Sequence, residues 1–421
     1  MTLVHKLNGF IQQKLSSQFL KNLGWLGLAE IAYRGLRLGL LVVTAQFLSR
    51  TDYGLGATIL SVREFAITFC DVGVAAKVIQ ADEKELPELC NSAYWLNWVV
   101  FSSLFFVQCL AAFPVSWFAK TNDLILPICV SAIPFLIWPL AGINKNLIQR
   151  ENRFHIIAIT EITQNLIGVI SCGFLIVSGL GVWAFVIPAL IQAPIEAFLL
   201  SKGHSWRVST RFTTKYWKEI FDFGKNILGV TFLRTLRNNL DNFIVIGFLG
   251  MEQFGIYSMG FNSGLGISLS VINAINSAIL PHLCAERDNY FGFKKSYLKS
   301  LKNISFLIIP LVILQSSLAQ FYVPKVFGER WIPAVPILVL ICISAIPRAF
   351  ADASSQLLVA VGKPHLNFRW NIIFTSIFTV SLLFAAQSKS IIIVAITVLF
   401  VHVICLPLFV IWATKFVFAK K

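Results

Sequence analysis

Charged residues are scarce in this chain. Only 13% of its 421 residues are charged, whereas a typical soluble domain carries about 25%, and the mean hydropathy is +0.75. Acidic residues are the scarcer kind, with 20 aspartates and glutamates against 35 lysines and arginines. A composition this apolar argues against an ordinary soluble enzyme and indicates a polytopic membrane protein.

Several chemical motifs are also missing. The chain has no Gly-x-x-x-x-Gly-Lys-Ser/Thr string and no HExxH, and its eight cysteines form no CxxC pair. These absences argue against a P-loop nucleotide site, a zinc site of the HExxH type and a dithiol redox centre. The six histidines fall mostly at the ends of apolar segments, so we expect them to be interfacial. We expect no catalytic residue, no metal and no cofactor.

A membrane glycosyltransferase or polysaccharide ligase is one class to weigh. Such enzymes place acids or histidines in sizeable external loops, and the external connections here are short, such as Gly179-Leu180-Gly181. The net charge of +15 invites a nucleic-acid reading. However, the basic residues recur beside apolar segments and no nucleic-acid motif is visible. We therefore expect neither an enzyme nor a nucleic-acid partner.

Long apolar segments dominate what is present. We expect twelve spans, near residues 22–48, 54–80, 92–118, 124–149, 155–179, 182–202, 219–248, 254–283, 301–323, 333–361, 366–386 and 390–414.

The loop charges orient these spans. On one side lie 22 lysines and arginines, against five on the other side and eight within spans. The positive-inside rule then places both termini in the cytoplasm. Residues 1–21 alternate leucines and lysines at helical spacing, which predicts an amphipathic helix on the cytoplasmic surface.

A short pattern occurs twice. Phe47–Gly54 and Phe248–Gly255 share the order Phe-Leu-small-x-x-polar-aromatic-Gly, about 200 residues apart. The repeat predicts an all-α fold of two six-helix lobes, 22–202 and 219–421, joined by a basic linker at 203–218. Because six spans preserve orientation, the lobes should be related by a pseudo-two-fold axis along the membrane normal. The alternative is chance similarity between apolar helices.

Paired arginines lie deep inside two spans. Arg34 and Arg37 form one Arg-x-x-Arg pair, and Arg234 and Arg237 form another. A charge at this depth costs roughly 2.5–3.5 kcal/mol on insertion scales, so it must face something polar. Two further arginines are expected at similar depth, which completes the predicted diphosphate-binding set: Arg34, Arg37, Arg63, Arg234, Arg237 and Arg348.

Guanidinium groups stay charged and bind phosphate oxygens in a bidentate fork, so we expect this set to hold a diphosphate. The alternative is internal pairing at i,i+4 spacing, as in Glu30–Arg34 and Arg237–Asp241. Other polar residues in spans are expected to line the cavity or to couple transport to an ion. The cavity residues are Asn238 and Asn273, and the coupling candidates are Asp241, Glu161 and Glu64. Each carboxylate is equally explained as a static counter-ion.

The order and spacing of several short strings resemble a known family. The strings are 48–54 (LSRTDYG), 71–80 (DVGVAAKVIQ), 94–97 (YWLN), 149–154 (QRENRF), 239–242 (NLDN), 246–250 (IGFLG), 254–258 (FGIYS) and 327–331 (FGERW). Together they resemble the polysaccharide exporters of the multidrug/oligosaccharidyl-lipid/polysaccharide (MOP) superfamily, above all the O-antigen and exopolysaccharide-repeat flippases.

The resemblance implies a V-shaped pair of six-helix lobes in the bacterial cytoplasmic membrane. It also implies the substrate, an O-antigen or exopolysaccharide repeat unit on undecaprenyl diphosphate, carried from the inner to the outer leaflet. Membrane lipids, a polysaccharide polymerase and other assembly proteins are the implied partners. Many relatives carry two more C-terminal helices. The runner-up is a MATE-like drug/cation antiporter of the same fold, whose chamber should be acidic or aromatic rather than basic.

Overall fold

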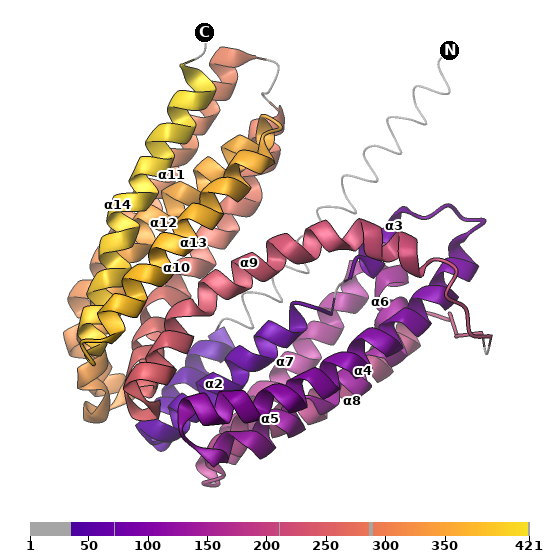
Figure 1. Cartoon of the computed structure of the whole chain (residues 1–421), viewed down its shortest axis with the longest axis horizontal. Helices are drawn as coiled ribbons and strands as arrows, with labels where there is room; N and C mark the ends of the chain where they lie inside the picture. Colours follow the sequence, from indigo (N-terminus) through magenta and orange to yellow (C-terminus); the bar gives the residue numbers. More distant parts are fainter. Residues whose placement is uncertain (1–34, 71, 210, 286–288, 420–421) are drawn as a thin grey trace. The chain divides into compact units, whose positions relative to one another are not determined.

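The computed structural model describes residues 35–419 except 71, 210 and 286–288, and every regular element within them is a helix (Figure 1). This confirms the all-α fold class. The chain divides into two compact units. The first comprises residues up to Leu48, Thr58–Trp117 and Thr121–Leu236, and the second comprises Ser49–Ala57, Phe118–Lys120 and Arg237–Lys421.

The first half of the chain supplies most helices of the first unit. They are an apolar helix at Gly35–Phe47, α2 (Arg50–Ile67), α3 (Val74–Gln80), α4 (Leu86–Ala119), α5 (Ile125–Ser131), α6 (Pro139–Arg150), α7 (Phe154–Val177) and α8 (Ile187–Gly203). Short 3-10 turns at Asn122–Leu124, Ile133–Leu136 and Gly181–Phe185 connect some of them.

The second half supplies six longer helices. They are α9 (Trp217–Leu249), α10 (Met251–Ala285), α11 (Tyr290–Tyr322), α12 (Val335–Ala360), α13 (Pro364–Ala386) and α14 (Ile391–Phe418). A π-turn at Val323–Phe327 and a 3-10 turn at Glu329–Ala334 join α11 to α12. Three helices are shared between the units, since the first turns of α2 and the last two residues of α4 belong to the second unit and α9 changes unit after Leu236.

Two expected spans are interrupted. The segment 54–80 is not one helix, because α2 ends at Ile67 and α3 begins after Gly73, whose φ of +94° is left-handed. The segment 124–149 is also broken, and its two parts meet at 54°. Prolines at 127, 134 and 139 explain this bend, because proline lacks the amide hydrogen that a continuous helix needs.

Within the described residues, seven helices are long and apolar enough to cross a membrane, or eight if the bent pair counts as one span. The chain is therefore a multi-pass membrane protein. The count of twelve spans and the symmetry of the two lobes stay predictions. The expected surface helix at 1–21 lies outside the described residues.

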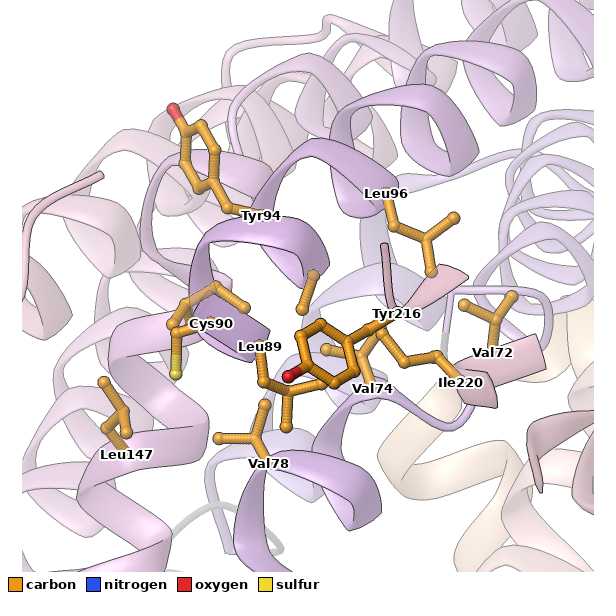
Figure 2. Close-up of a cluster of buried hydrophobic side chains, with 12 residues drawn as sticks. Val72, Val74, Val78, Leu89, Cys90, Tyr94, Leu96, Leu147, Tyr216 and Ile220 are labelled. Carbon is orange, nitrogen blue, oxygen red and sulfur yellow. The ribbon is translucent and has the colours of Figure 1, made fainter. Parts of the chain in front are cut away.

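The first unit has a tight hydrophobic core at one end (Figure 2). Val78 from α3, Leu89 from α4 and Ile220 from α9 are almost fully buried there, together with Tyr216 just before α9. A Cβ atom on Gly224 would collide with the carbonyl of Val72, so the start of α9 lies directly against the turn before α3. This close approach anchors α9 in the first unit.

The second unit is a helical bundle with α12 at its centre. α12 packs against α10, α11, α13 and α14 (Figure 1). Its most apolar stretch is 56% buried, whereas that of every other candidate span is at most 33% buried. A polar side chain on the inner face of α12 is therefore enclosed by protein rather than by lipid.

The repeated sequence pattern coincides with a helix crossing inside the second unit. A Cβ on Gly54 would collide with the carbonyl of Met251, and a Cβ on Gly255 would collide with the carbonyl of Arg50. Each glycine thus touches the residue four positions before its counterpart, so the first turns of α2 and α10 cross with local two-fold symmetry. The aligned glycines of the repeat contact each other, which gives the pattern a structural meaning.

Candidate functional site

A polar cavity of about 60 Å³ lies inside the second unit. Its charged lining comes from two helices. Arg237 and Asp241 lie one turn apart on α9, and Arg348 and Asp352 lie one turn apart on α12. A space of this size holds a few water molecules or a small ion rather than an oligosaccharide.

Asparagine side chains orient both arginines of the cavity. The Nη2 atom of Arg348 donates a hydrogen bond to Oδ1 of Asn238 over 3.0 Å. Nη1 of Arg237 donates to Oδ1 of Asn371, and the amide of Asn371 in turn donates to the carbonyl of Asn367 over 2.8 Å. Each guanidinium is thus held by a helix other than its own, which fixes its direction toward the cavity.

The acidic side of the cavity is equally well ordered. Asp241 is only 4% exposed, and its Oδ2 accepts a hydrogen bond from the hydroxyl of Tyr257 on α10 over 2.7 Å. Asp352 contributes a second carboxylate to the lining. With both aspartates ionised and the histidine of the lining neutral, the two arginines are formally balanced. The cavity therefore becomes cationic if a carboxylate gains a proton or moves away, or if the histidine gains a proton.

An aromatic wall closes the remaining side, and it contains a histidine. His402 is 8% exposed, and its Nδ1 lies 2.6 Å from the carbonyl of Val398. The rings of Phe374 and Phe378 lie 5.6 and 5.5 Å from the imidazole. The expectation that the histidines are interfacial is wrong for His402, which lies deep within α14.

The spacing of residues along α14 contains a signal for His402 that the sequence prediction missed. Val398, His402, Leu406 and Phe409 follow one face of α14, and all four line the cavity. A histidine on an otherwise apolar face needs an internal partner, and that requirement was visible in the sequence. Asn371 on α13 follows the same logic, since it sits among the lining aromatics 370, 374 and 378.

Three other predicted arginines, Arg37, Arg63 and Arg234, lie in the first unit. Arg37 and Arg234 are exposed, Arg63 is half-buried and Glu64 is exposed. The end of α2 lies near α9 there: Thr68, just after α2, donates a hydrogen bond to Thr235 over 3.0 Å, and the rings of Phe65 and Phe232 are 5.5 Å apart. The helices that carry Arg63 and Arg234 are thus neighbours.

Two of the six predicted arginines share a described site. Arg237 and Arg348 share the cavity, and Asn238 and Asp241 line it with them. Glu161 is half-buried on α7, in the first unit. Arg34 and the side chain of Asn273 lie outside what the structure describes.

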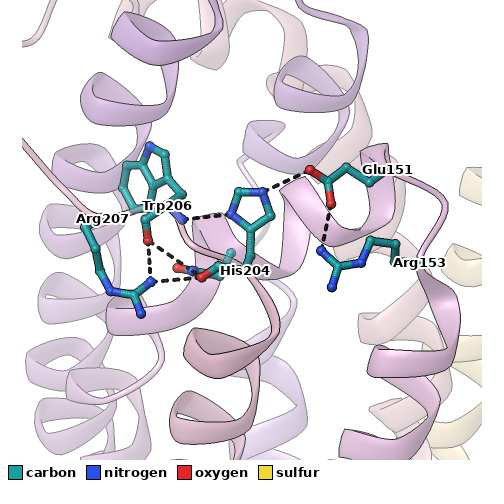
Figure 3. Close-up of polar contacts among 6 residues, drawn as sticks. Glu151, Arg153, His204, Trp206 and Arg207 are labelled. Atoms are coloured by element: carbon teal, nitrogen blue, oxygen red, sulfur yellow. Dashed lines mark hydrogen bonds and ion pairs between the residues drawn. The ribbon is translucent and has the colours of Figure 1, made fainter.

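A second polar cluster closes one end of the first unit (Figure 3). Glu151 accepts a hydrogen bond from Arg153 over 3.0 Å and lies 3.1 Å from Nε2 of His204. The hydrogen bond from Arg153, supported by His204, lowers the pKa of Glu151 below its ordinary value. His204 Nδ1 also accepts the backbone N–H of Trp206 over 3.0 Å. These contacts tie the α6–α7 turn to the segment after α8, which is a structural role.

The chain matches a known protein family over more than half of its length. A family described as polysaccharide biosynthesis protein matches residues 43–336. The teichuronic acid biosynthesis protein TuaB of Bacillus subtilis (strain 168) is 24% identical over 392 residues, covering 90% of this chain and 79% of that protein. The lipopolysaccharide biosynthesis protein WzxC of Escherichia coli (strain K12) is 23% identical over 388 residues, covering 90% and 77%.

Two solved structures share the fold. The lipid II flippase MurJ in an inward closed conformation superposes with a TM-score of 0.73 at 14% identity, over 93% of this chain and 87% of that one. An inward-facing multidrug resistance MATE family transporter of the MOP superfamily also gives 0.73, at 10% identity, over 91% and 94%. The fold is therefore that of the MOP superfamily.

Proposed function

This chain belongs to the polysaccharide biosynthesis protein family, and on that premise we propose that it is a flippase for a lipid-linked oligosaccharide. The proposed substrate is a repeat unit of an O-antigen or exopolysaccharide on undecaprenyl diphosphate. The chain moves it from the inner to the outer leaflet of the bacterial cytoplasmic membrane by alternating access. Both termini lie in the cytoplasm, and a polysaccharide polymerase is among its partners.

Three comparisons support this substrate class. Two relatives are named for the biosynthesis of teichuronic acid and of lipopolysaccharide, and a protein of the same fold is named a lipid II flippase. The protein of the same fold is named a flippase, which favours a non-enzymatic role.

One observation in the second unit carries the proposal. Arg237 and Arg348 line one cavity, and asparagines from other helices hold both guanidinium groups in place. A guanidinium has five N–H donors, so Arg348 keeps donors for a phosphate oxygen beside its bond to Asn238. We assign these two arginines to the substrate diphosphate.

Asp241 gives the cavity a way to change its charge. While it is ionised, the two aspartates balance the two arginines. Protonation of Asp241 would leave a net positive charge that favours an anion in a weakly screened site. We propose that this exchange couples diphosphate binding to the transport cycle.

The assignment is tested by removing one guanidinium. We expect Arg348→Ala to reduce export of surface polysaccharide at least roughly tenfold, since a hydrogen bond to a charged group is worth about 1.5–3 kcal/mol. Arg348→Lys should retain part of the activity because it keeps the charge. The matched control is Arg369→Ala, which removes an exposed arginine of the same unit that does not line the cavity. Normal export by Arg348→Ala at normal protein abundance would refute the diphosphate role.

The substrate class has its own test. Deletion of the gene should cause complete lipid-linked repeat units to accumulate on the inner leaflet, measured by extracting the lipids and identifying their glycans. If no lipid-linked saccharide accumulates, the flippase assignment fails.

Asp241 is tested by a neutral substitution. We expect Asp241→Asn to bind diphosphate more tightly, because it removes a negative charge next to the arginines, and yet to transport poorly. The comparison is Tyr257→Phe, which removes the hydrogen bond but keeps the carboxylate. Equal affinity of the wild type and Asp241→Asn for a polyprenyl diphosphate in detergent would rule out the charge exchange.

A MATE-like drug/cation antiporter is the second candidate. Asp241, Asp352 and the aromatic wall of the cavity suit an organic cation, and a MATE transporter shares the fold. Loss of the gene would then lower resistance to cationic dyes and leave surface glycans unchanged, the opposite of the flippase result.

A further inference from the structure

The first three turns of α11 carry a basic face that the transport mechanism does not use. Lys294, Lys295, Lys299 and Lys302 are exposed, and they surround a shallow hollow of about 450 Å³ that Phe291 and Leu298 complete. We call these six residues the lysine face. α11 contains no aspartate or glutamate. None of the ion pairs among the described residues involves the lysine face.

Helix length places the lysine face at the membrane surface. Residues 303–322 contain no charged side chain, and about 20 residues are what an α-helix needs to cross the hydrocarbon core. α11 begins at Tyr290, so its first turns extend roughly 20 Å beyond that stretch at 1.5 Å per residue. The lysine face therefore lies at the level of the lipid headgroups.

The opposite side of the same turns is firmly packed. Phe293 and Tyr297 are buried at helical spacing, and the hydroxyl of Tyr297 lies 2.9 Å from Ser354 Oγ and 3.0 Å from Thr414 Oγ1. The hydroxyl of Tyr290 donates to the carbonyl of Phe418 over 2.9 Å. These contacts with α12 and α14 hold the helix so that its lysines always face outward.

Two apolar residues distinguish this face from a merely solvated one. Phe291 is 81% exposed and Leu298 is 48% exposed, and both lie among the lysines. Apolar side chains beside basic ones are typical of helical surfaces at the membrane interface, where the ammonium groups meet lipid phosphates.

The corresponding place in the other half of the chain has no such face. α4 is the counterpart of α11 in the predicted repeat, and counted from the helix starts the positions that match Lys294–Lys302 are residues 90–98, none of which is charged. The lysine face is therefore specific to one half, so it is not a consequence of the duplicated architecture.

From these observations we propose that the lysine face of α11 is a binding site for anionic phospholipid headgroups. Residues 294 to 302 extend along the helix for about 12 Å, which is more than one phosphate group spans. Lysine ammonium groups are flexible point charges, and they suit several headgroups better than one bidentate contact. The site is independent of the arginine cavity and of the substrate.

Bound lipid can be counted directly. The full-length protein is delipidated in detergent and titrated with phosphatidylglycerol or phosphatidylcholine, and bound lipids are counted by native mass spectrometry. We expect phosphatidylglycerol to bind more tightly than phosphatidylcholine. The Lys295→Gln/Lys299→Gln variant should lose roughly tenfold or more of its phosphatidylglycerol affinity, since each basic residue near an anionic surface contributes appreciably.

The matched control is Lys325→Gln/Lys363→Gln. It removes the same charge from exposed lysines of the same unit away from the face, and it should stay within about twofold of the wild type. Equal losses in both variants would show that only net charge matters, and no loss in the first variant would show that the face binds no lipid. If the first variant binds phosphatidylglycerol normally but loses affinity for a polyprenyl diphosphate, the face serves the substrate. Each of these results overturns the proposal.

Discussion

Glu151 illustrates how single residues hold the membrane-surface ends of this protein together. The hydrogen bond from Arg153, with His204 beside it, lowers the pKa of Glu151. A carboxyl whose pKa is lowered by folding stabilises the native state above its unfolded pKa. That contribution is lost as the pH falls through the folded pKa.

Glu151→Gln should therefore destabilise the protein at neutral pH and not in acid. The loss should be below about 1 kcal/mol, because the pair is largely exposed and water screens it. The midpoint of thermal unfolding in detergent is compared at two pH values. One is pH 7, and the other lies below the folded pKa of Glu151, which is itself below the ordinary glutamate value of about 4.3. Glu85→Gln, an exposed carboxylate of the same unit, is the control and should show no such pH dependence. A loss of stability that is equal at both pH values would contradict the assigned contact.

Four polar residues of the cavity were predicted from the sequence, and two others were not. Arg237, Asn238, Asp241 and Arg348 were predicted because a charge or amide within an apolar span must face something polar. His402 and Asn371 were missed although each is a polar residue on an otherwise apolar helix face, which indicates an internal partner. Spacing along one helix does not reveal which neighbouring helix supplies that partner.

At the scale of secondary structure, the crossing of α2 and α10 is the most constrained feature. Gly54 and Gly255 bring two backbones into contact, and Arg50 beside them bonds to Glu252 over 3.0 Å and to the carbonyl of Arg330 over 2.7 Å. A methyl group on either glycine would meet main-chain atoms, which cannot turn aside as a flexible side chain can.

Gly255→Ala should thus destabilise the protein by about 1–3 kcal/mol, the usual cost of overpacking. Gly173→Ala in α7 is the matched control, because a Cβ there meets nothing within 4 Å. It should be neutral or stabilising by about 0.5–1 kcal/mol, since alanine favours a helix. Unfolding midpoints of both variants, with polysaccharide export measured in cells, provide the comparison. A Gly255→Ala protein as stable as Gly173→Ala would mean that the helices separate there at no cost.

At the scale of the whole molecule, the main prediction concerns which side of the membrane each end of the chain faces. The asymmetry of lysines and arginines predicts that both termini face the cytoplasm. Single cysteines placed in a variant without the eight native cysteines test this prediction directly.

We expect Lys389→Cys and Lys120→Cys to react with a membrane-impermeant maleimide in intact cells. Lys215→Cys should react only after the cells are permeabilised. Labelling of Lys215→Cys in intact cells would show that the predicted orientation is inverted. If Lys120→Cys and Lys389→Cys are labelled on opposite sides of the membrane, the predicted number of spans between them is wrong.

The sequence by itself determined the class of this protein. Its apolar segments and scarce charge require a helical membrane protein, because in lipid each backbone group must find its partner within the helix. The order of the short strings pointed to the family, and the pattern shared by Phe47–Gly54 and Phe248–Gly255 indicated an internal duplication.

Only the tertiary structure decided which polar groups meet. It joined Arg237 and Arg348 in one cavity, balanced them with Asp241 and Asp352, and brought His402 to the same wall. It also broke two expected spans at a left-handed glycine and at a run of prolines. Hydropathy reports how readily each segment enters lipid. It carries no information about which face of a helix meets which neighbour, and that packing fixes the charge and shape of the site.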